Sequence, residues 1–503
     1  MTLTKLIEDI ILSEGHLWIR EAKLKKNMIR RRMSPDILSS LEGIRTITVD
    51  NIVYYSLPQY DMWETYASFD AIRILKNYKT PVISDSLLDS YINAGEDELK
   101  LKLHEQQRAA VICAVRNGFC VITGGPGTGK TSVLKVLKYV LRKIQYDVDI
   151  RFTAPTGKAA RRITESAGNF AKTVQKELGI TYTNTNKAMF GGDVLIIDEI
   201  SMLDMETAYH TFRAIKNGQK VILVGDIDQL PSVGPGAVLR DLIFSDVIPK
   251  VELTKTFRQA NDSNLFANIL RIRESEWIMT EGDDFEIVHT PNIRDDFKSL
   301  NQLVEMFMKE YQQFGVEGVA CLLPYRKAGV LCSDYVNNVL QSHVNEIRNK
   351  PYFTSQTETG LKVKFTLGDP VMQLVNRAEC ANGDVGFVKK MSYGKLYVEY
   401  IDCTVAYTQK ELQQLSLAYS MSINKSQGSE YPSVVMGITT AHKAMLNKNL
   451  LYTGVTRAKK RVCLLQEDAA MQIAVNKEVA YERITMMAEK LNFYYKKEIL
   501  DVA

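Results

Sequence analysis

The segment Gly124–Thr131, which reads GGPGTGKT, constrains the fold of this chain more than any other. It follows the apolar run 119–123, which predicts a buried strand, and it precedes residues 132–137, whose apolar spacing predicts a helix. A glycine-rich loop between a strand and a helix turns its backbone N–H groups toward a phosphate, and the helix N-terminus adds a favourable dipole. The pattern is that of a Walker A motif, so we expect an α/β domain that binds a nucleoside triphosphate at this loop.

Two adjacent polar residues at the end of this loop suggest roles in nucleotide binding. Lys130 would reach the β- and γ-phosphates, and the Thr131 hydroxyl would hold Mg²⁺. A glycine-rich turn that matches by chance is the alternative, and the complete pattern in its strand–loop–helix context argues against it. The expected nucleotide-binding residues of the loop are Gly125, Pro126, Gly127, Thr128, Gly129, Lys130 and Thr131.

Length and composition narrow the class of protein. A chain of 503 residues is too long for one ordinary core, so two to four domains are expected. It has no apolar run of the roughly 18 residues that span a membrane, and acids interrupt its apolar N-terminus, so we expect a cytoplasmic protein. The 7 cysteines form no C-x-x-C pair, which argues against structural zinc. With a net charge of +4, any nucleic-acid surface must be a local patch.

Residues 194–199 read as a buried strand that ends in two carboxylates. Asp198 would ligate Mg²⁺ through water, and Glu199 would polarise the attacking water. An apolar run that ends in Asp-Glu is common by itself, but in a chain with an intact Walker A motif it predicts a Walker B motif.

A further strand at 221–226 leads into Gln229. An uncharged amide that follows a strand beside the γ-phosphate can sense that phosphate and signal its presence to a neighbouring surface. The alternative is an ordinary loop at the start of a helix.

The order of these and later motifs resembles that of superfamily 1 helicases. The residues within the motifs are most similar to those of the RecD-like branch, whose members translocate 5′ to 3′ on single-stranded DNA. The resemblance extends over roughly residues 99–470 and implies ATP as the nucleotide and Mg²⁺ as its metal. The segments that carry it are 124–131, 198–202, 225–234, 256–259, 424–430 and 452–458.

The resemblance also assigns roles around the nucleotide. It implies that Gln107 reads the adenine base and that the Phe257 ring stacks on it. Arg258 and Arg457 match two arginines that reach the γ-phosphate from a second lobe, where they would make hydrolysis depend on closure. For Arg457 the alternative is a solvated charge within the basic run 457–461.

A nucleic-acid track is expected at 153–162, which follows a strand and opens a helix with hydroxyl, backbone N–H and lysine donors suited to a phosphate. In the resembled family this motif grips single-stranded DNA; the alternative is an ordinary charged helix start. Residues 422–426 offer a second grip, and Gly428 and Glu430 beside them would contact the nucleotide and couple it to DNA. The expected DNA-binding residues are Pro155, Thr156, Lys158, Ser422, Asn424, Lys425 and Ser426.

Two grips whose separation changes with ATP imply inchworm movement. Asn424 and Gln175 depart from the family, whose members often carry histidine at both positions. Both side chains still form hydrogen bonds, so the departures bear on the details of DNA contact and coupling rather than on motor function.

The expected fold class is α/β, with two RecA-like P-loop lobes, an SH3-like β-barrel inserted in the second lobe and a winged-helix-like N-terminal domain. Residues 1–98 would form the N-terminal domain. Residues 99–256 would form the first lobe, with a short hairpin at about 179–192. Residues 257–344 and 413–503 would form the second lobe, and 345–412 the β-rich insertion.

The first hundred residues give weaker signals. Residues 6–12 predict an amphipathic helix, Ser34-Pro35 predicts another helix start, and Asp50-Asn51 predicts a two-residue hairpin turn. The basic run 23–32 would bind DNA phosphates or form a solvated helix face, and the aromatic residues nearby would stack on bases or, more in keeping with such clusters, pack in a core. In the first lobe, Tyr182 is a weak candidate for the tip of a duplex-splitting pin.

The leading functional hypothesis is an ATP-driven 5′-to-3′ DNA helicase that acts as a monomer on single strands and on single-strand/duplex junctions, without a membrane. Its rivals are a translocase that unwinds poorly, as one subunit of a larger complex, and a nucleotide-gated DNA-loading factor. RNA stays open as a substrate because a backbone grip does not exclude a 2′-OH. A bacterial or phage origin is expected, and the pathway (repair, recombination, replication or plasmid transfer) is open, as are replication or recombination partners.

Overall fold

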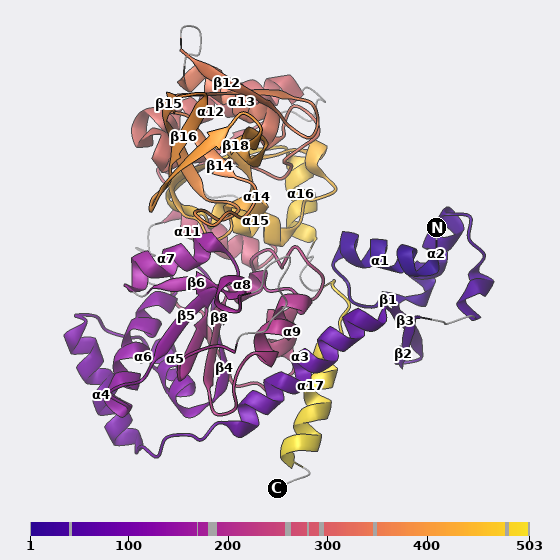
Figure 1. The fold of residues 1–503 in the computed structure, drawn as a ribbon, viewed down its shortest axis with the longest axis vertical. Coiled ribbons are helices and arrows are strands. Elements are labelled where there is room, and N and C mark those ends of the chain that lie inside the picture. Colours follow the sequence, from indigo (N-terminus) through magenta and orange to yellow (C-terminus); the bar gives the residue numbers. More distant parts are fainter. Residues whose placement is uncertain are drawn as a thin grey trace. The chain divides into compact units, whose positions relative to one another are not determined.

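The computed structural model describes residues 2–39, 43–168, 170–179, 189–256, 263–278, 281–290, 296–345, 350–477 and 482–500. The chain divides into two units (Figure 1). Unit 1 comprises Met1–Pro155, Ile163–Arg258 and Val479–Ala503, and unit 2 comprises Thr156–Arg162 and Gln259–Glu478. In the order of the chain, unit 2 is therefore largely an insertion within unit 1.

Unit 1 is built around a six-stranded parallel sheet with the strand order β6-β5-β7-β8-β4-β9. β4, β7 and β8 are buried along their whole lengths, which explains why their sequences are nearly continuous apolar runs. The parallel α/β lobe predicted around the glycine-rich loop is thus confirmed. The strands are β4 (Phe119–Gly124), β5 (Ile150–Ala154), β6 (Ala171–Thr173), β7 (Val194–Ile197), β8 (Lys220–Gly225) and β9 (Lys250–Leu253).

Helices connect these strands, as parallel pairing requires. α7 begins in the part of the chain assigned to unit 2 and continues into unit 1. The helices are α5 (Glu105–Arg116), α6 (Lys130–Ile144), α7 (Gly157–Ala167), α8 (Val174–Glu177), α9 (Met205–Arg213) and α10 (Val238–Phe244), with the 3₁₀ turn η2 (Ile200–Met202).

The N-terminal residues form helices and a three-stranded antiparallel sheet ordered β1-β3-β2. Asp50 and Asn51 join β2 to β3 with φ values of 49° and 61°, so both adopt the left-handed conformation of a tight hairpin turn, as predicted. The helix expected from Ser34-Pro35 is only a short 3₁₀ helix. The elements are α1 (Leu3–Glu14), β1 (Ile19–Arg20), α2 (Glu21–Arg30), η1 (Pro35–Ser39), β2 (Arg45–Val49), β3 (Ile52–Ser56), α3 (Pro58–Asn77) and α4 (Asp85–Glu98).

The C-terminal segment returns to unit 1, which corrects the assignment of 413–503 as a whole to the second lobe. α17 (Met487–Tyr495), followed by the π-helix η5 (Lys496–Leu500), lies beside α3 (Figure 1). The physical reason is shared burial, since Met487 and Leu491 belong to the same apolar core as α1 and the central sheet.

A buried carboxylate reinforces this packing. Glu64 of α3 is fully buried and accepts hydrogen bonds from Trp18 Nε1 (2.9 Å), Met486 N (2.6 Å) and Lys490 Nζ (2.9 Å). One side chain therefore joins the N-terminal module (α1 to β3), α3 and the C-terminal segment (residues 482–500).

Unit 2 contains a second parallel sheet, with the strand order β10-β21-β20-β11-β19. Its strands are β10 (Phe285–His289), β11 (Val319–Leu323), β19 (Ser420–Ser422), β20 (Tyr431–Ile438) and β21 (Ala458–Gln466). Its helices are α11 (Asn264–Arg273), α12 (Asp296–Gly318), α13 (Ser333–Val344), α14 (Ile423–Ser426), α15 (Lys448–Val455) and α16 (Asp468–Asn476), with the 3₁₀ turn η4 (Thr440–His442).

A β-rich subdomain interrupts this second α/β region. It consists of a five-stranded antiparallel sheet ordered β17-β16-β15-β14-β18 and a separate β12-β13 hairpin. The strands extend to Leu417, a little beyond the limit expected from the sequence. They are β12 (Tyr352–Gln356), β13 (Lys362–Thr366), β14 (Pro370–Gln373), β15 (Val385–Ser392), β16 (Lys395–Glu399), β17 (Thr404–Thr408) and β18 (Leu415–Leu417), with η3 (Glu411–Gln414).

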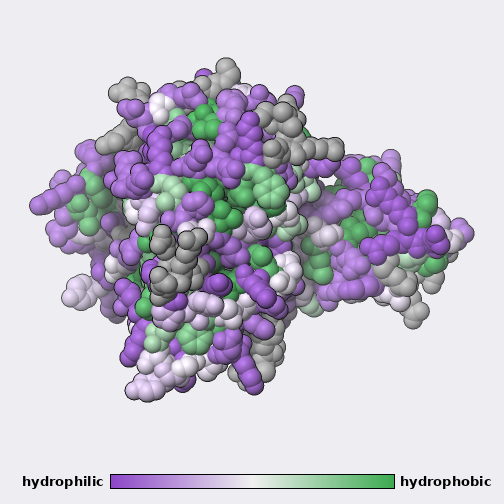
Figure 2. All heavy atoms as spheres, turned by 90° about the horizontal axis from the view of Figure 1, so that it is seen from above, coloured by the Kyte–Doolittle hydropathy of each residue, from purple (hydrophilic) through white to green (hydrophobic). Residues whose placement is uncertain are grey.

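The face in Figure 2 is largely covered by hydrophilic residues, between which hydrophobic ones occur in small groups. Within the ranges that the structure describes, no helix has both the length and the apolar character needed to cross a membrane.

We predict that Glu64→Ala lowers the free energy of unfolding of unit 1 by about 3–5 kcal/mol, because it leaves the Trp18 and Met486 N–H groups without this acceptor and the half-buried Lys490 ammonium with Asp61 alone. Glu64→Gln keeps two acceptor lone pairs and should cost less. Urea unfolding followed by tryptophan fluorescence measures both. Glu8→Ala, which removes only an exposed pairing with Lys5, is the control and should leave the midpoint unchanged. An equal midpoint for Glu64→Ala and wild type would contradict the assigned role.

Candidate functional site

The glycine-rich loop follows β4 and ends at the first residue of α6, as the sequence predicts. Gly127 and Gly129 have φ values of 74° and 81°, a left-handed conformation that favours glycine. A side chain is excluded at position 124, because a Cβ on Gly124 would lie 2.8 Å from the Leu253 carbonyl oxygen of β9. The Thr128 hydroxyl donates to the Gly125 carbonyl at 2.8 Å and closes the loop on itself.

Lys130 is the first residue of α6, with Thr131 next to it on an exposed position. The Lys130 ammonium donates to the carbonyls of Gly124 and Gly125, the latter at 3.0 Å. The ammonium therefore lies against the loop whose backbone is expected to cradle phosphates.

Gln107 connects α5 to this loop. Its side-chain carbonyl accepts from His104 N at 2.9 Å, and its Nε2 donates to the Thr128 carbonyl at 2.9 Å. The side chain is buried. Sequence reasoning assigned Gln107 to the base of the nucleotide and missed its direct bond to the loop, which no local sequence pattern signals.

Asp198 and Glu199 follow β7 at the carboxyl edge of the sheet. Asp198 N donates to the Thr153 carbonyl at 3.0 Å, and the Asp198 carboxylate accepts from Glu199 N at 2.8 Å. Glu199 has a φ of 55°, which is strained for a residue with a side chain, and such strain occurs often at functional sites.

The same edge of the sheet carries polar groups that suit a bound ion or phosphate. Among the described residues, the buried hydroxyls of Thr123, Thr153 and Ser201 have no hydrogen-bond partner. In parallel sheets, ligands bind outside the carboxyl ends of the strands. Mg²⁺ prefers oxygen ligands, which Thr131 and Asp198 would supply. The residues at this edge therefore fit a nucleotide with its metal.

Gln229 lies in the loop of residues 226–236 that follows β8, called the Gln229 loop below. Its Nε2 donates to one carboxylate oxygen of Asp226 at 3.2 Å, while the other oxygen accepts from Asp228 N at 3.1 Å. Asp226 thus fixes the turn that carries Gln229. The role of Asp226 was missed, although an aspartate that bonds the backbone two residues ahead is a known turn signal.

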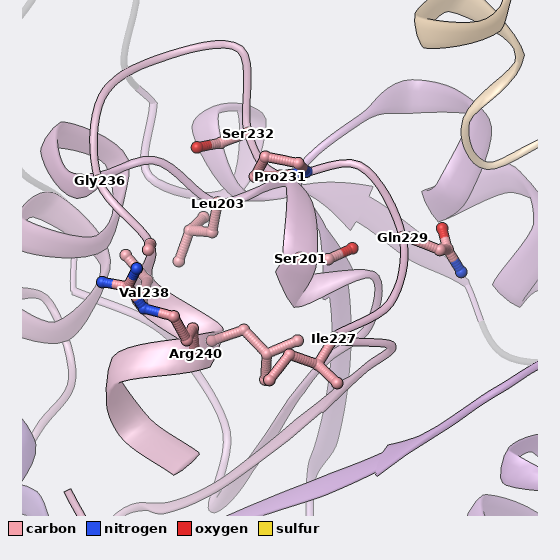
Figure 3. Close-up of a pocket in the computed structure, with 11 residues that line it drawn as sticks. Ser201, Leu203, Ile227, Gln229, Pro231, Ser232, Gly236, Val238 and Arg240 are labelled. Atoms are coloured by element: carbon pink, nitrogen blue, oxygen red, sulfur yellow. The ribbon is translucent and has the colours of Figure 1, made fainter. Parts of the chain in front are cut away.

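A small pocket is lined by the Gln229 loop, η2 and the start of α10 (Figure 3). Ser201 and Gln229 lie on one side of it, and Val238 and Arg240 lie on the other (Figure 3). The segment after β7 and the Gln229 loop therefore contribute residues to the same pocket.

Arg457 in unit 2 is not a solvated charge, so the alternative interpretation of this residue is wrong. It is 3% exposed, and its guanidinium donates to the carbonyls of Thr453 (3.0 Å) and Ser429 (3.2 Å) and to the Thr456 hydroxyl (3.2 Å). α15 and the segment after α14 thus fix it within its own unit.

The two residues expected to couple nucleotide to DNA, Gly428 and Glu430, flank Ser429, whose carbonyl accepts from Arg457. The Glu430 carboxylate accepts from Arg162 at 2.8 Å and pairs with Lys459 at 3.4 Å. Gly428 has a φ of 75°, and a Cβ there would lie 3.3 Å from Ala159 N. All of these groups belong to unit 2.

The residues expected to grip DNA partly meet within unit 2. Lys158 Nζ donates to the Lys425 carbonyl at 3.1 Å, and Lys425 Nζ donates to the Asn382 side chain at 2.7 Å. Burial lowers the pKa of Lys158 to about 8, Asp384 opposes this shift, and the cations Lys425 and Arg161 add to it. Burial also lowers the pKa of Lys425.

The remaining residues of the expected track have local roles as well. Ser422 precedes the first turn of α14, and the buried Ser426 hydroxyl donates to the Ile423 carbonyl at 2.7 Å. Asn424 Oδ1 is buried without a hydrogen-bond partner among the described residues. Thr156 Oγ1 accepts from Ala159 N at 3.3 Å at the start of α7, directly after Pro155.

Several expected residues lie outside the described ranges. They are Phe257, Arg258 and Tyr182.

The chain is similar to known proteins in sequence. Residues 102–283 match the family model of an AAA domain, and residues 417–465 match that of a UvrD-like helicase C-terminal domain. The ATP-dependent RecD2 DNA helicase of Deinococcus radiodurans is 32% identical over 389 residues, which cover 75% of this chain and 51% of that protein. The RecBCD enzyme subunit RecD of Mycolicibacterium smegmatis is 27% identical over 431 residues, covering 77% of this chain and 75% of that protein.

Over about three quarters of its length the chain is therefore similar to RecD-type helicases, and these similarities support a superfamily 1 helicase. It spans about half the length of the Deinococcus relative and three quarters of the Mycolicibacterium one. The AAA-domain match contains the glycine-rich loop and the Asp198–Glu199 pair, which identifies this part of the RecD-like chain as nucleotide-binding. Among solved structures, a Pif1 helicase from Bacteroides in complex with ADP-AlF3 and ssDNA aligns with a TM-score of 0.47 and 20% identity, covering 79% of this chain and 98% of that one.

We predict that Gln107→Ala weakens nucleotide binding of this RecD-like protein by roughly tenfold, because the loop loses the amide that orders its Thr128 carbonyl. Titration with a fluorescent ADP analogue measures the affinity. Arg108→Ala is the matched control, since Arg108 lies on the same helix but contacts Asn93, Asp89 and Glu96 instead of the loop. Equal affinities for Gln107→Ala and Arg108→Ala would contradict the proposed link.

Proposed function

We propose that this chain is an ATP-dependent helicase that moves 5′ to 3′ along single-stranded DNA and unwinds duplex ahead of it. The observation that carries the proposal is the Walker A loop, the Asp198–Glu199 pair and Gln229 on neighbouring strand ends of one parallel sheet. Similarity to RecD-type proteins supports the step from nucleotide binding to helicase activity, because the Deinococcus relative is named an ATP-dependent DNA helicase.

Each residue at the sheet edge would then have a role in ATP hydrolysis. Lys130 would neutralise the β- and γ-phosphates, and Thr131 and Asp198 would hold Mg²⁺. Glu199, whose backbone φ is positive, would orient the attacking water. Gln229, held by Asp226, would sense the γ-phosphate.

Two arginines would complete the ATP site. Arg457 is already fixed by carbonyls of its own unit, and a preorganised guanidinium stabilises charge in the transition state without reorganising. Arg258 is the second proposed arginine, and Phe257 is proposed to stack on the base. We propose that hydrolysis depends on closure of these arginines onto the nucleotide, which is the basis of an inchworm cycle.

The proposed DNA track uses Thr156 and Lys158 from one motif and Ser422, Asn424 and Lys425 from the other. The hydrogen bond of 3.1 Å from Lys158 Nζ to the Lys425 carbonyl supports a common DNA track for these two lysines. We also propose that the antiparallel β-rich subdomain is an SH3-like barrel and that the N-terminal module is winged-helix-like, both of which would contact DNA or the junction.

A second candidate function is a motor subunit that unwinds little by itself. It is favoured by one observation, namely that several relatives are named as subunits of the RecBCD enzyme. Such a subunit would hydrolyse ATP on single-stranded DNA and would need partner proteins to separate strands.

Strand displacement with ATP and Mg²⁺ tests both candidates. We expect unwinding of a duplex with a 5′ single-stranded tail and none of a duplex with a 3′ tail. Lys130→Ala is the control and should abolish ATP hydrolysis while it leaves DNA binding measurable. DNA-stimulated hydrolysis without unwinding of either duplex would favour the motor subunit, and unwinding only from the 3′ tail would contradict the polarity.

The pKa of Lys158 predicts a pH-dependent grip. Its charged form, which binds phosphate, dominates below its pKa of about 8 and is lost as the pH rises through that value. The affinity for oligo-dT should therefore fall by up to roughly tenfold between about pH 7 and pH 9. Fluorescence anisotropy measures it. In Lys158→Arg the charge persists, so the affinity should stay level; the same decline in both proteins would contradict a contact by Lys158.

A further inference from the structure

The second half of the Gln229 loop is held by a side chain from the far end of the sequence. Arg483 Nη1 donates to the carbonyls of Gly234 (2.9 Å) and Gly236 (2.7 Å) and to the Ser232 hydroxyl (3.1 Å). Its Nη2 donates to the Ser232 carbonyl at 2.7 Å. A single guanidinium thus donates to four acceptor atoms, which belong to alternate residues 232, 234 and 236 of the loop.

Other contacts of the same loop are made with fixed parts of unit 1. Met205 N, at the start of α9, donates to the Pro235 carbonyl at 2.9 Å, and Gly236 N donates to the Gly15 carbonyl at 2.9 Å. A Cβ at Gly234 would lie 2.2 Å from the Asp204 carboxylate, so the loop packs closely there. Its path is therefore set by α9, the N-terminal module and Arg483 together.

The backbone on either side of the Arg483 side chain is itself anchored. Ile484 N donates to His16 Nδ1 at 3.0 Å, and the Ile484 carbonyl accepts from Leu17 N and Trp18 N. The Arg483 carbonyl accepts from Arg240 at 2.7 Å. The guanidinium is consequently presented from a rigid support rather than from a loose tail.

The electrostatics favour a specific rather than an incidental contact. Arg483 is buried, and burial together with Arg240 lowers its pKa to about 10, so it keeps its charge at neutral pH. A buried cation bonded to carbonyl oxygens is costly unless its donors are well placed. Gly15 supplies the space for it, because a Cβ there would lie 2.5 Å from the guanidinium carbon.

We propose that Arg483 is a positioning residue for the ATPase reaction, which acts by holding residues 232–236 and thereby the Gln229 carboxamide. Asp226 fixes the Gln229 loop at its start, and Arg483 fixes it three residues beyond Gln229. The inference rests on the proposed function, since Gln229 is assigned there to the γ-phosphate. It adds that the sensor depends on the C-terminal segment and, through Gly15 and His16, on the N-terminal module.

The competing explanation is that Arg483 merely helps the C-terminal segment to dock. Lys490 separates the two explanations, because it lies in the same segment and binds Asp61 and Glu64 of α3 but does not contact the Gln229 loop. Lys490→Ala should weaken docking and leave the loop in place.

The test is steady-state ATP hydrolysis with saturating oligo-dT. We expect Arg483→Ala to lower kcat by roughly tenfold with KM for ATP within about twofold of wild type, since the loss is in the reaction and not in ground-state binding. Arg483→Lys, whose ammonium retains three donors, should recover part of kcat, and Lys490→Ala should stay near wild type. Equal losses in Arg483→Ala and Lys490→Ala would overturn the proposal.

A double-mutant cycle asks whether Arg483 acts through Gln229. In a Gln229→Ala background, Arg483→Ala should lower kcat little further, because the group that it positions is already gone. Independent losses that multiply in the double variant would overturn the proposal.

Hydrogen exchange gives a readout that does not need activity. Amide exchange within residues 226–236 should be faster in Arg483→Ala than in wild type, while α3 and α17 keep their protection. If wild type shows no DNA-stimulated hydrolysis, the proposed function fails, yet this comparison still reports whether Arg483 orders the loop. Unchanged exchange in that loop would overturn the inference by itself.

Discussion

Parallel pairing of β4, β7 and β8 is the constraint on which the nucleotide site depends. Parallel strands release all their following loops at one edge, so the Walker A loop, the Asp198–Glu199 pair and the Gln229 turn begin side by side although they are far apart in the sequence. The same pairing buries both faces of these strands and accounts for their apolar sequences. Catalytic groups could not be brought together here without that buried layer.

The loops at this edge are stabilised by polar side chains that bond to them from neighbouring parts of unit 1. Gln107 bonds the Walker A loop, Asp226 bonds the turn of Gln229, and Arg483 bonds the end of that same loop. Each uses a polar side chain to satisfy backbone groups that no strand or helix would otherwise satisfy. The site is thus a set of loops whose positions are set by supporting residues drawn from several parts of unit 1.

The sequence predicted well what is local. Gly124–Thr131 carries its strand, turn and helix within one short segment, and Asp50-Asn51 defines its hairpin by backbone conformation alone. It predicted poorly what depends on distant pairs. Met486 N bonds Glu64 across a separation of 422 residues, and no periodicity or turn signal reports such a contact, so the C-terminal segment was assigned to the wrong lobe. The buried state of Arg457 likewise follows from tertiary contacts, because its local sequence is that of a charged surface.

The return of the C-terminal segment has a consequence for how the chain is made. α17 supplies part of the core shared by α1 and the central sheet, and this helix is synthesised after the whole of unit 2. On the ribosome, domains generally fold as units as they emerge. Unit 1 cannot do so completely, because the surface on α3 that receives α17 stays exposed until α17 has been synthesised. Unit 2 can therefore finish folding while α3, which is synthesised before unit 2, still lacks its packing partner α17, which is synthesised after unit 2.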